Sequence, residues 1–120
     1  MKTKLVRDKI PNIIMHAGGS PRYYVAEVPE YEARLISKMA EELHEFRENP
    51  CIEEAADMYA VLSALCGHWG WTMEEVRVEA EIKQRHRGGF DERYVLNLEP
   101  IFEADDDTED WLTTSHGEKV

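Results

Sequence analysis

Two clusters of acidic residues contain the side chains best suited to chemistry. The first cluster is Glu41, Glu42 and Glu45, and the second is Glu54 and Asp57. Residues three or four positions apart lie on one face of a helix, with Cβ atoms about 5–6 Å apart. Carboxylate oxygens are hard ligands, which suit Mg²⁺ or Mn²⁺ better than zinc. The spacing therefore predicts a metal ion held by Glu42, Glu45, Glu54 and Asp57.

The surroundings of the second cluster favour a bound cation. Converging carboxylates repel one another, so either one of them keeps its proton or a cation joins them. The second cluster lies in the most apolar segment of the chain, beside Ala55, Ala56, Met58 and Tyr59. A charge is costly to bury there without a partner. The alternative for either cluster alone is a solvated helix face, and only the two together favour a metal site.

Basic residues accompany the acidic clusters. Lys38 precedes Glu42 by four residues, and Lys83 and Arg87 are also four apart on a later segment. A carboxylate-held cation next to such bases suits a polyphosphate, because the metal bridges phosphoryl oxygens and the bases balance the remaining charge. The alternative for Lys38 is a simple ion pair with Glu42 or Glu41, worth a few tenths of a kcal/mol.

Four helical segments are expected to position these residues. Apolar periodicity, with glycine and proline at the boundaries, predicts helical structure in residues 5–17, 29–49, 51–68 and 72–87. Only Asn49-Pro50 separates the second segment from the third, so these two should pack antiparallel. The third segment is apolar over a wide arc, which predicts a central helix buried on more than one side. Thr72 and Glu75 fit a capping box at the start of the fourth.

The pattern changes after the fourth segment. Alternating apolar residues at 94–98 indicate a short strand or an extended arm against the core. Residues 101–120 hold seven of the 25 acidic side chains but only one of the 14 basic ones, which is typical of a solvated acidic tail. We therefore expect an all-α fold, an antiparallel helical bundle with a short extended segment, in residues 1–100, followed by an acidic tail in residues 101–120.

Composition narrows the class of protein further. A chain of 120 residues is long enough for one domain. Its net charge of −11 is opposite in sign to that of a non-specific nucleic-acid binder, so no nucleic-acid binding is expected. No apolar run approaches the roughly 18 residues of a membrane span. The N-terminus has no apolar stretch typical of a secretory signal, so we expect a cytoplasmic protein.

Three separated motifs resemble those of a known superfamily. They are Glu41-Glu42-x-x-Glu45 with Glu54-x-x-Asp57, Lys4-Leu5-Val6-Arg7-Asp8-Lys9-Ile10-Pro11, and Lys83-x-x-x-Arg87-Gly88-Gly89-Phe90. Together they resemble the all-α nucleotide pyrophosphohydrolases, the MazG-like superfamily, which also includes phosphoribosyl-ATP pyrophosphohydrolase and the dimeric dUTPases. The second and third motifs resemble a branch of small proteins often labelled phosphoribosyl-ATP pyrophosphohydrolase-like. The resemblance covers about residues 4–98.

The resemblance implies hydrolysis of a nucleoside triphosphate between the α and β phosphates, giving a monophosphate and pyrophosphate. It implies that Mg²⁺, or Mn²⁺ in its place, is held by Glu42, Glu45, Glu54 and Asp57. Glu41 would hold a second ion or orient the attacking water, so that Glu41 and Glu42 are the candidate catalytic residues. Phosphate contacts would come from Lys38, Lys83 and Arg87. Members of the superfamily are usually homodimers or homotetramers whose sites border a subunit interface, and nothing is carried onto the acidic tail.

Two alternatives stay open. Within the enzymes, the substrate could be phosphoribosyl-ATP, an intermediate of histidine biosynthesis, since no residue selects it over another nucleotide. In a different class, the chain could be a non-catalytic acidic helical binding protein. A di-iron site, which Glu41-x-x-His44 suggests, is disfavoured because no second histidine of the sequence follows a glutamate at this spacing.

Overall fold

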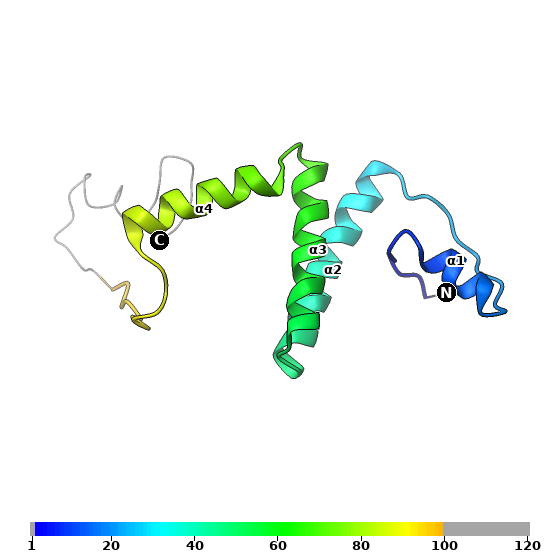
Figure 1. Cartoon of the computed structure of the whole chain (residues 1–120), viewed down its shortest axis with the longest axis horizontal. Coiled ribbons are helices and arrows are strands. Elements are labelled where there is room, and N and C mark those ends of the chain that lie inside the picture. The colour runs from blue at the N-terminus through cyan, green and yellow to red at the C-terminus, as the bar shows by residue number, and fades with distance from the viewer. Residues whose placement is uncertain (1, 100–120) are drawn as a thin grey trace. The chain divides into compact units, whose positions relative to one another are not determined.

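The computed structural model describes residues 2–99, and their secondary structure is entirely helical (Figure 1). The four helices are α1 (Ile10–His16), α2 (Val28–Glu48), α3 (Ile52–His68) and α4 (Met73–Arg87). The expected all-α class is therefore confirmed for these residues. The predicted bounds of the last three helices are correct to within one residue, and the first is confined to the apolar part of its segment.

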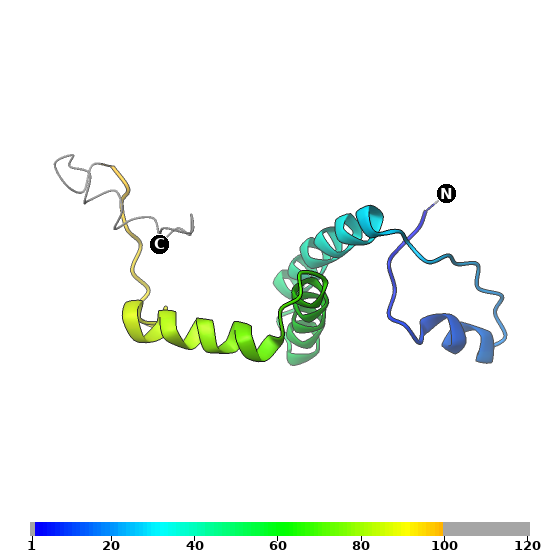
Figure 2. The ribbon, with the colours of Figure 1, turned by 90° about the horizontal axis from the view of Figure 1, so that it is seen from above.

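Helices α2 and α3 form a helical hairpin, and they are the one pair of helices in residues 2–99 that pack against each other. Figures 1 and 2 show them side by side, joined by a short connection. Pro29 occupies the first turn of α2, where its missing N–H costs no hydrogen bond. Asn49, at the end of α2, has φ −143° and ψ 78°, which takes the chain out of the helix before Pro50. The buried apolar side chains of the described residues are Leu35 of α2 and Val61 and Cys66 of α3.

The expectation that α3 is buried on more than one side is wrong for the single chain. Tyr59 is 59% exposed and Ile52 is 84% exposed, although both belong to the wide apolar arc of this helix. The reason is that only α2 covers α3 among the helices described. The apolar pattern alone therefore does not determine whether this arc is covered.

The N-terminal segment, residues 2–9, lies against the hairpin. Arg34 of α2 donates hydrogen bonds to the Thr3 carbonyl oxygen at 3.2 Å and to its hydroxyl oxygen at 2.6 Å. Leu5 and Ile10 are half-buried, unlike the charged residues between them. These contacts fix the path of a segment that has no regular structure until α1 begins.

Helix α4 has the ends predicted for it. The Glu75 amide donates to the Thr72 hydroxyl at 3.1 Å, and the Thr72 amide donates to the Glu75 carboxylate at 3.2 Å, which confirms the capping box. Gly88 follows the helix with φ +83°, a left-handed conformation that glycine adopts without strain. Arg77 forms ion pairs with Glu74 and Glu81 on the same helix.

The residues after α4 form no strand up to residue 99, so the first of the two alternatives for 94–98, a short strand, is wrong. The segment is irregular, and its packing against the core as an extended arm stays a prediction. The side chains of Tyr94, Val95 and Leu98 are exposed. The predicted acidic tail, 101–120, lies outside the described residues. The chain divides into two compact units, Met1–Arg85 and His86–Val120, and the division falls in the last turn of α4. None of the described helices is both long and apolar enough to cross a bilayer.

Candidate functional site

Three of the four predicted metal ligands come together at the hairpin. Glu42 of α2 and Glu54 and Asp57 of α3 each offer a carboxylate oxygen, and these oxygens lie within 4.8 Å of one another. Glu42 is only 9% exposed, and the other two are half-buried. Glu54 and Asp57 share a face of α3 because they are three residues apart. The short connection between the helices brings that face opposite Glu42.

Glu45, the fourth predicted ligand, does not belong to this group. It is exposed, one turn along α2 from the buried Glu42. A step of three residues also rotates a side chain by about 60° around the helix axis, and here this rotation takes Glu45 toward solvent. It still acts on the site through its charge, since it contributes to the raised pKa of Glu54.

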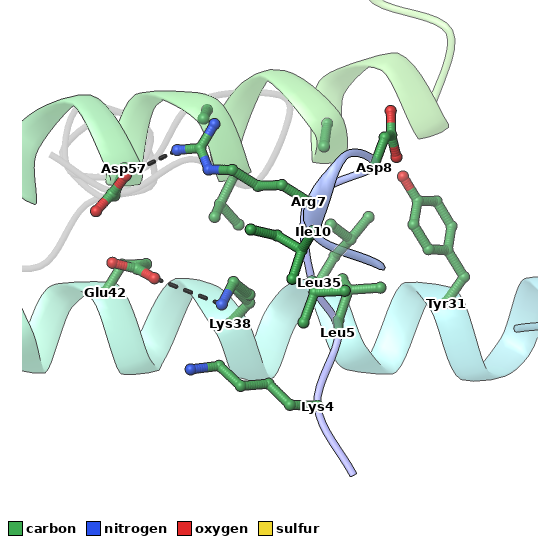
Figure 3. A pocket seen from close by; sticks show the side chains of 14 residues that line it. Lys4, Leu5, Arg7, Asp8, Ile10, Tyr31, Leu35, Lys38, Glu42 and Asp57 are labelled. Atoms are coloured by element: carbon green, nitrogen blue, oxygen red, sulfur yellow. Dashed lines mark hydrogen bonds and ion pairs between the residues drawn. The ribbon is translucent and has the colours of Figure 1, made fainter. Parts of the chain in front are cut away.

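Two cations pair with carboxylates of this cluster, and a third pairs with the neighbouring Glu41; Figure 3 shows the three basic side chains. Lys38 Nζ is 3.6 Å from Glu42 Oε1, so the ion pair considered for this lysine is present. Arg7 Nη2 is 2.7 Å from Asp57 Oδ1, and Lys4 Nζ is 3.0 Å from Glu41 Oε1. Two of the three cations thus come from the N-terminal segment, where no site residue was predicted.

The pKa values of Glu54 and Glu41 are shifted in opposite directions. Burial raises the pKa of Glu54, and the charges of Asp57 and Glu42 raise it further. By contrast, the hydrogen bond from Lys4 lowers the pKa of Glu41. Among the described residues Glu54 has no ion-pair partner, so it is the carboxylate of the cluster for which an added cation relieves the most repulsion.

The fit to a metal ion follows from the donor set. Oxygens that share one Mg²⁺ at 2.0–2.1 Å lie at most about 4.2 Å apart, so a spread of up to 4.8 Å needs only small rotations of the side chains. Three hard oxygen donors fit Mg²⁺ or Mn²⁺, with water or phosphate oxygens completing the coordination shell.

A cavity of about 540 Å³ adjoins the carboxylates. One part of its wall is apolar, with Leu5, Leu35, Val61 and Ala64. Another part is charged, with side chains from the N-terminal segment and both hairpin helices: Lys4, Arg7, Lys38, Glu42 and Asp57. A volume of this size suits a small ligand that has an apolar portion and a charged portion.

Lys83 and Arg87, the other predicted phosphate contacts, are on α4 and do not line this cavity. Arg87 belongs to the second compact unit, and Lys83 is half-buried near the end of the first. Their role stays a prediction.

No role was predicted for Lys4 and Arg7, although both belong to the motif from Lys4 to Pro11 that helps to carry the resemblance. They form part of a basic run, Lys2 to Lys9, in a strongly acidic chain. Nothing in the spacing says which carboxylates such a run would meet, because Arg7 and Asp57 are 50 positions apart.

No protein-family model matches the chain, and the searches of curated proteins and of solved structures find no match either.

Proposed function

We propose that the chain is a Mg²⁺-dependent nucleotide pyrophosphohydrolase, which hydrolyses a nucleoside triphosphate between its α and β phosphates. The observation that carries this proposal is the convergence of Glu42, Glu54 and Asp57 beside a cavity lined by cations. The motif resemblance supports the same reaction. The products would be a nucleoside monophosphate and pyrophosphate.

The three converging carboxylates would hold the ion, and Glu45 would be an exposed neighbour that does not coordinate it in the present arrangement. Mg²⁺ or Mn²⁺ would supply charge neutralisation and a more acidic bound water. Hydrolysis joins the water oxygen to one phosphorus, and the bridging oxygen leaves with the other phosphoryl group. Lys38, half-buried beside Glu42, is placed to balance phosphate charge.

Glu41 is the proposed proton acceptor or orienting group. Its carboxylate is half-buried and bonded to Lys4, which holds its pKa below the ordinary value. A carboxylate in this state accepts a proton poorly. Glu41 therefore orients water more readily than it removes a proton, unless Lys4 moves to another anion.

The decisive experiment measures products from a panel of nucleoside triphosphates and phosphoribosyl-ATP with Mg²⁺. We expect pyrophosphate and a monophosphate from at least one of them, and loss of both products in Glu42→Gln and Asp57→Asn. Glu79→Gln, an exposed glutamate of α4, is the matched control and should behave as the parent. Release of inorganic phosphate alone, or undiminished rates in both site variants, would contradict the proposal.

The same panel separates the two alternatives. Preference for phosphoribosyl-ATP would identify the histidine-pathway reaction. Absence of turnover with all substrates, together with an unchanged melting temperature in Mg²⁺ or Mn²⁺, would favour the non-catalytic acidic binding protein, because ligand binding to the native state raises that temperature.

We also propose that the chain is a homodimer or homotetramer in which a second copy covers α3 and completes an antiparallel bundle. Only three apolar side chains are buried in residues 2–99, while Ile52, Tyr59 and Leu62 remain exposed on α3. Several large apolar side chains exposed on one helix are typical of an interaction surface. Light scattering should give a multiple of the monomer mass, and Tyr59→Glu should reduce it. A monomeric parent at micromolar concentration would contradict this assembly.

A further inference from the structure

The N-terminal segment brings two cations to the carboxylates of the hairpin from a distant part of the sequence. Lys4 pairs with Glu41 of α2, and Arg7 pairs with Asp57 of α3. Figure 3 shows the Arg7 side chain reaching across the cavity toward Asp57, with the amino groups of Lys4 and Lys38 facing the same region. The segment therefore forms a cationic wall opposite the acidic one.

The backbone of this wall is anchored, whereas its charged side chains are accessible. Arg34 holds Thr3 through two hydrogen bonds, and the apolar side chains of Leu5 and Ile10 line the cavity. The Arg7 side chain itself is 62% exposed. An arginine on an anchored backbone can change partners by rotating its long side chain, without movement of the fold.

Arg7 donates a hydrogen bond to a carboxylate oxygen of Asp57, a proposed metal ligand. Asp57 Oδ1 accepts its guanidinium hydrogen bond at 2.7 Å, and Asp57 is one of the three residues whose oxygens converge. A cation bound to that group and a guanidinium bonded to it repel each other, so they compete for Asp57. The guanidinium fork that fits a carboxylate also fits a phosphate.

From this geometry we propose that Arg7 exchanges partners, from the Asp57 carboxylate to the polyphosphate chain of the metal-bound nucleotide. The N-terminal segment is then the phosphate-binding side of the cavity, with Lys4 and Lys38 beside Arg7. This inference rests on the proposed function and assigns the recognition of its phosphates. It gives Arg7 two effects of opposite sign: competition with the metal and attraction of the phosphates.

The test compares Arg7→Gln with the parent in two titrations. Mn²⁺ alone is titrated and followed by calorimetry, and inorganic tripolyphosphate is then titrated into protein in excess Mg²⁺. We expect Mn²⁺ to bind about two- to five-fold more tightly to Arg7→Gln, the range that loss of one exposed ion pair allows. The affinity of Arg7→Gln for tripolyphosphate should be about ten-fold lower than that of the parent, since a charge-assisted hydrogen bond is lost.

Two variants control for other effects of the substitution. Arg77→Gln also removes an exposed arginine that pairs with carboxylates, and it changes the net charge equally, but it lies on α4. It should match the parent in both titrations. Arg7→Lys keeps the charge without the planar fork, and its tripolyphosphate affinity should lie between those of the parent and Arg7→Gln. Circular dichroism of each variant reports whether the helices are intact.

The outcomes separate the exchange from the function on which it rests. If the parent binds Mn²⁺ and Arg7→Gln loses affinity for both probes, Arg7 is structural and the exchange is wrong. Equal affinities of the parent and Arg7→Gln for both probes would also overturn the exchange. Neither result would contradict the proposed metal site. A parent that binds no Mn²⁺ would overturn the metal site and the exchange together.

Discussion

Two groups of closely spaced charges within residues 2–99, one on α4 and one at the hairpin, differ in how they are balanced. On α4, Arg77 pairs with Glu74 and Glu81, all within two turns of one helix. At the hairpin, Glu54 and Asp57 meet Glu42 from another helix. Lys38 pairs with Glu42 within α2, whereas Arg7 reaches Asp57 from the N-terminal segment. The α4 charges are neutralised locally, whereas at the hairpin only Glu42 has a local partner. The balance of Asp57 depends on the folded path of the chain, and Glu54 has no ion-pair partner among the described residues.

The pKa shifts of one carboxylate from each group, Glu54 and Glu74, show what this difference means. The hydrogen bond from Arg77 lowers the pKa of Glu74, so folding favours the charged carboxylate. Burial and neighbouring charges raise the pKa of Glu54, so folding disfavours it. A carboxylate that is repelled by neighbouring acids is a candidate for cation binding, because a bound cation removes the repulsion. The comparison therefore supports the proposed cation site at the hairpin, whereas the carboxylates of α4 already have a cation in Arg77.

Of the substitutions that test the difference between the hairpin cluster and the α4 network, Asp57→Asn is expected to have the largest effect. The variant should lose the rise in melting temperature caused by Mn²⁺ and should reduce nucleotide hydrolysis by at least about a hundred-fold, because transition-state charge is no longer balanced. Chelation with EDTA should lower the melting temperature of the parent but not of this variant. Glu81→Gln on α4 should leave both properties unchanged. If Asp57→Asn and Glu81→Gln behaved alike, the proposed functional difference between the hairpin and α4 would be contradicted.

A second prediction concerns the packing beneath the site. Leu35 is 3% exposed and lines the cavity next to Lys38, so Leu35→Ala should destabilise the protein by about 2–4 kcal/mol. Val78→Ala on the partly exposed surface of α4 should change stability by no more than about 0.5 kcal/mol. Urea denaturation at one fixed protein concentration measures both. A small effect at Leu35 would show that the hairpin core does not support the site.

The features that could be predicted are those that depend on neighbours in the sequence. Apolar periodicity and the Asn49-Pro50 break located α2 and α3, and Thr72 with Glu75 located the start of α4. The pairing of Glu54 with Asp57 follows from helical spacing alone. Each of these features is determined by residues that lie within about two helical turns of one another in the sequence.

The features that could not be predicted depend on the three-dimensional path of the chain. The position of Arg7 at Asp57 is set by how residues 2–9 cross the hairpin, which no spacing encodes. The exposure of Glu45 depends on which side of α2 meets α3. The alternating residues 94–98 have the period of a strand, but a strand needs a partner for its hydrogen bonds, and residues 2–99 provide none.

A third prediction uses the opposite pKa shifts of Glu54 and Glu74. Folding raises the pKa of Glu54 above 4.5, so this carboxyl group binds its proton more tightly in the folded protein than in the unfolded one. Protonation of Glu54 therefore stabilises the fold at low pH, and this contribution is lost as the pH rises through the raised pKa. For Glu74 the sign reverses, and stability is lost as the pH falls below 4.5. Without metal at neutral pH, Glu54→Gln should therefore raise the melting temperature and Glu74→Gln should lower it.

The metal response separates these two variants further. Glu54→Gln removes a ligand, so Mn²⁺ should stabilise it less than the parent, whereas Glu74→Gln should respond as the parent does. Thermal melts with EDTA and with Mn²⁺ give all four values. A Glu54→Gln protein that is destabilised in EDTA would show that this carboxylate is not repelled in the fold.

The smallest effect is expected from Arg77→Gln, which leaves Glu74 and Glu81 without their shared partner. All three side chains are exposed, so water and salt already screen their attraction. We expect a slight loss of helix content and melting temperature, which disappears at about 1 M NaCl, where the screening length is about 3 Å. Nucleotide hydrolysis should be unchanged. If hydrolysis fell while helix content was retained, the charges of α4 would belong to the site, and Lys83 and Arg87 on the same helix would regain the phosphate-binding role that the motif resemblance implies.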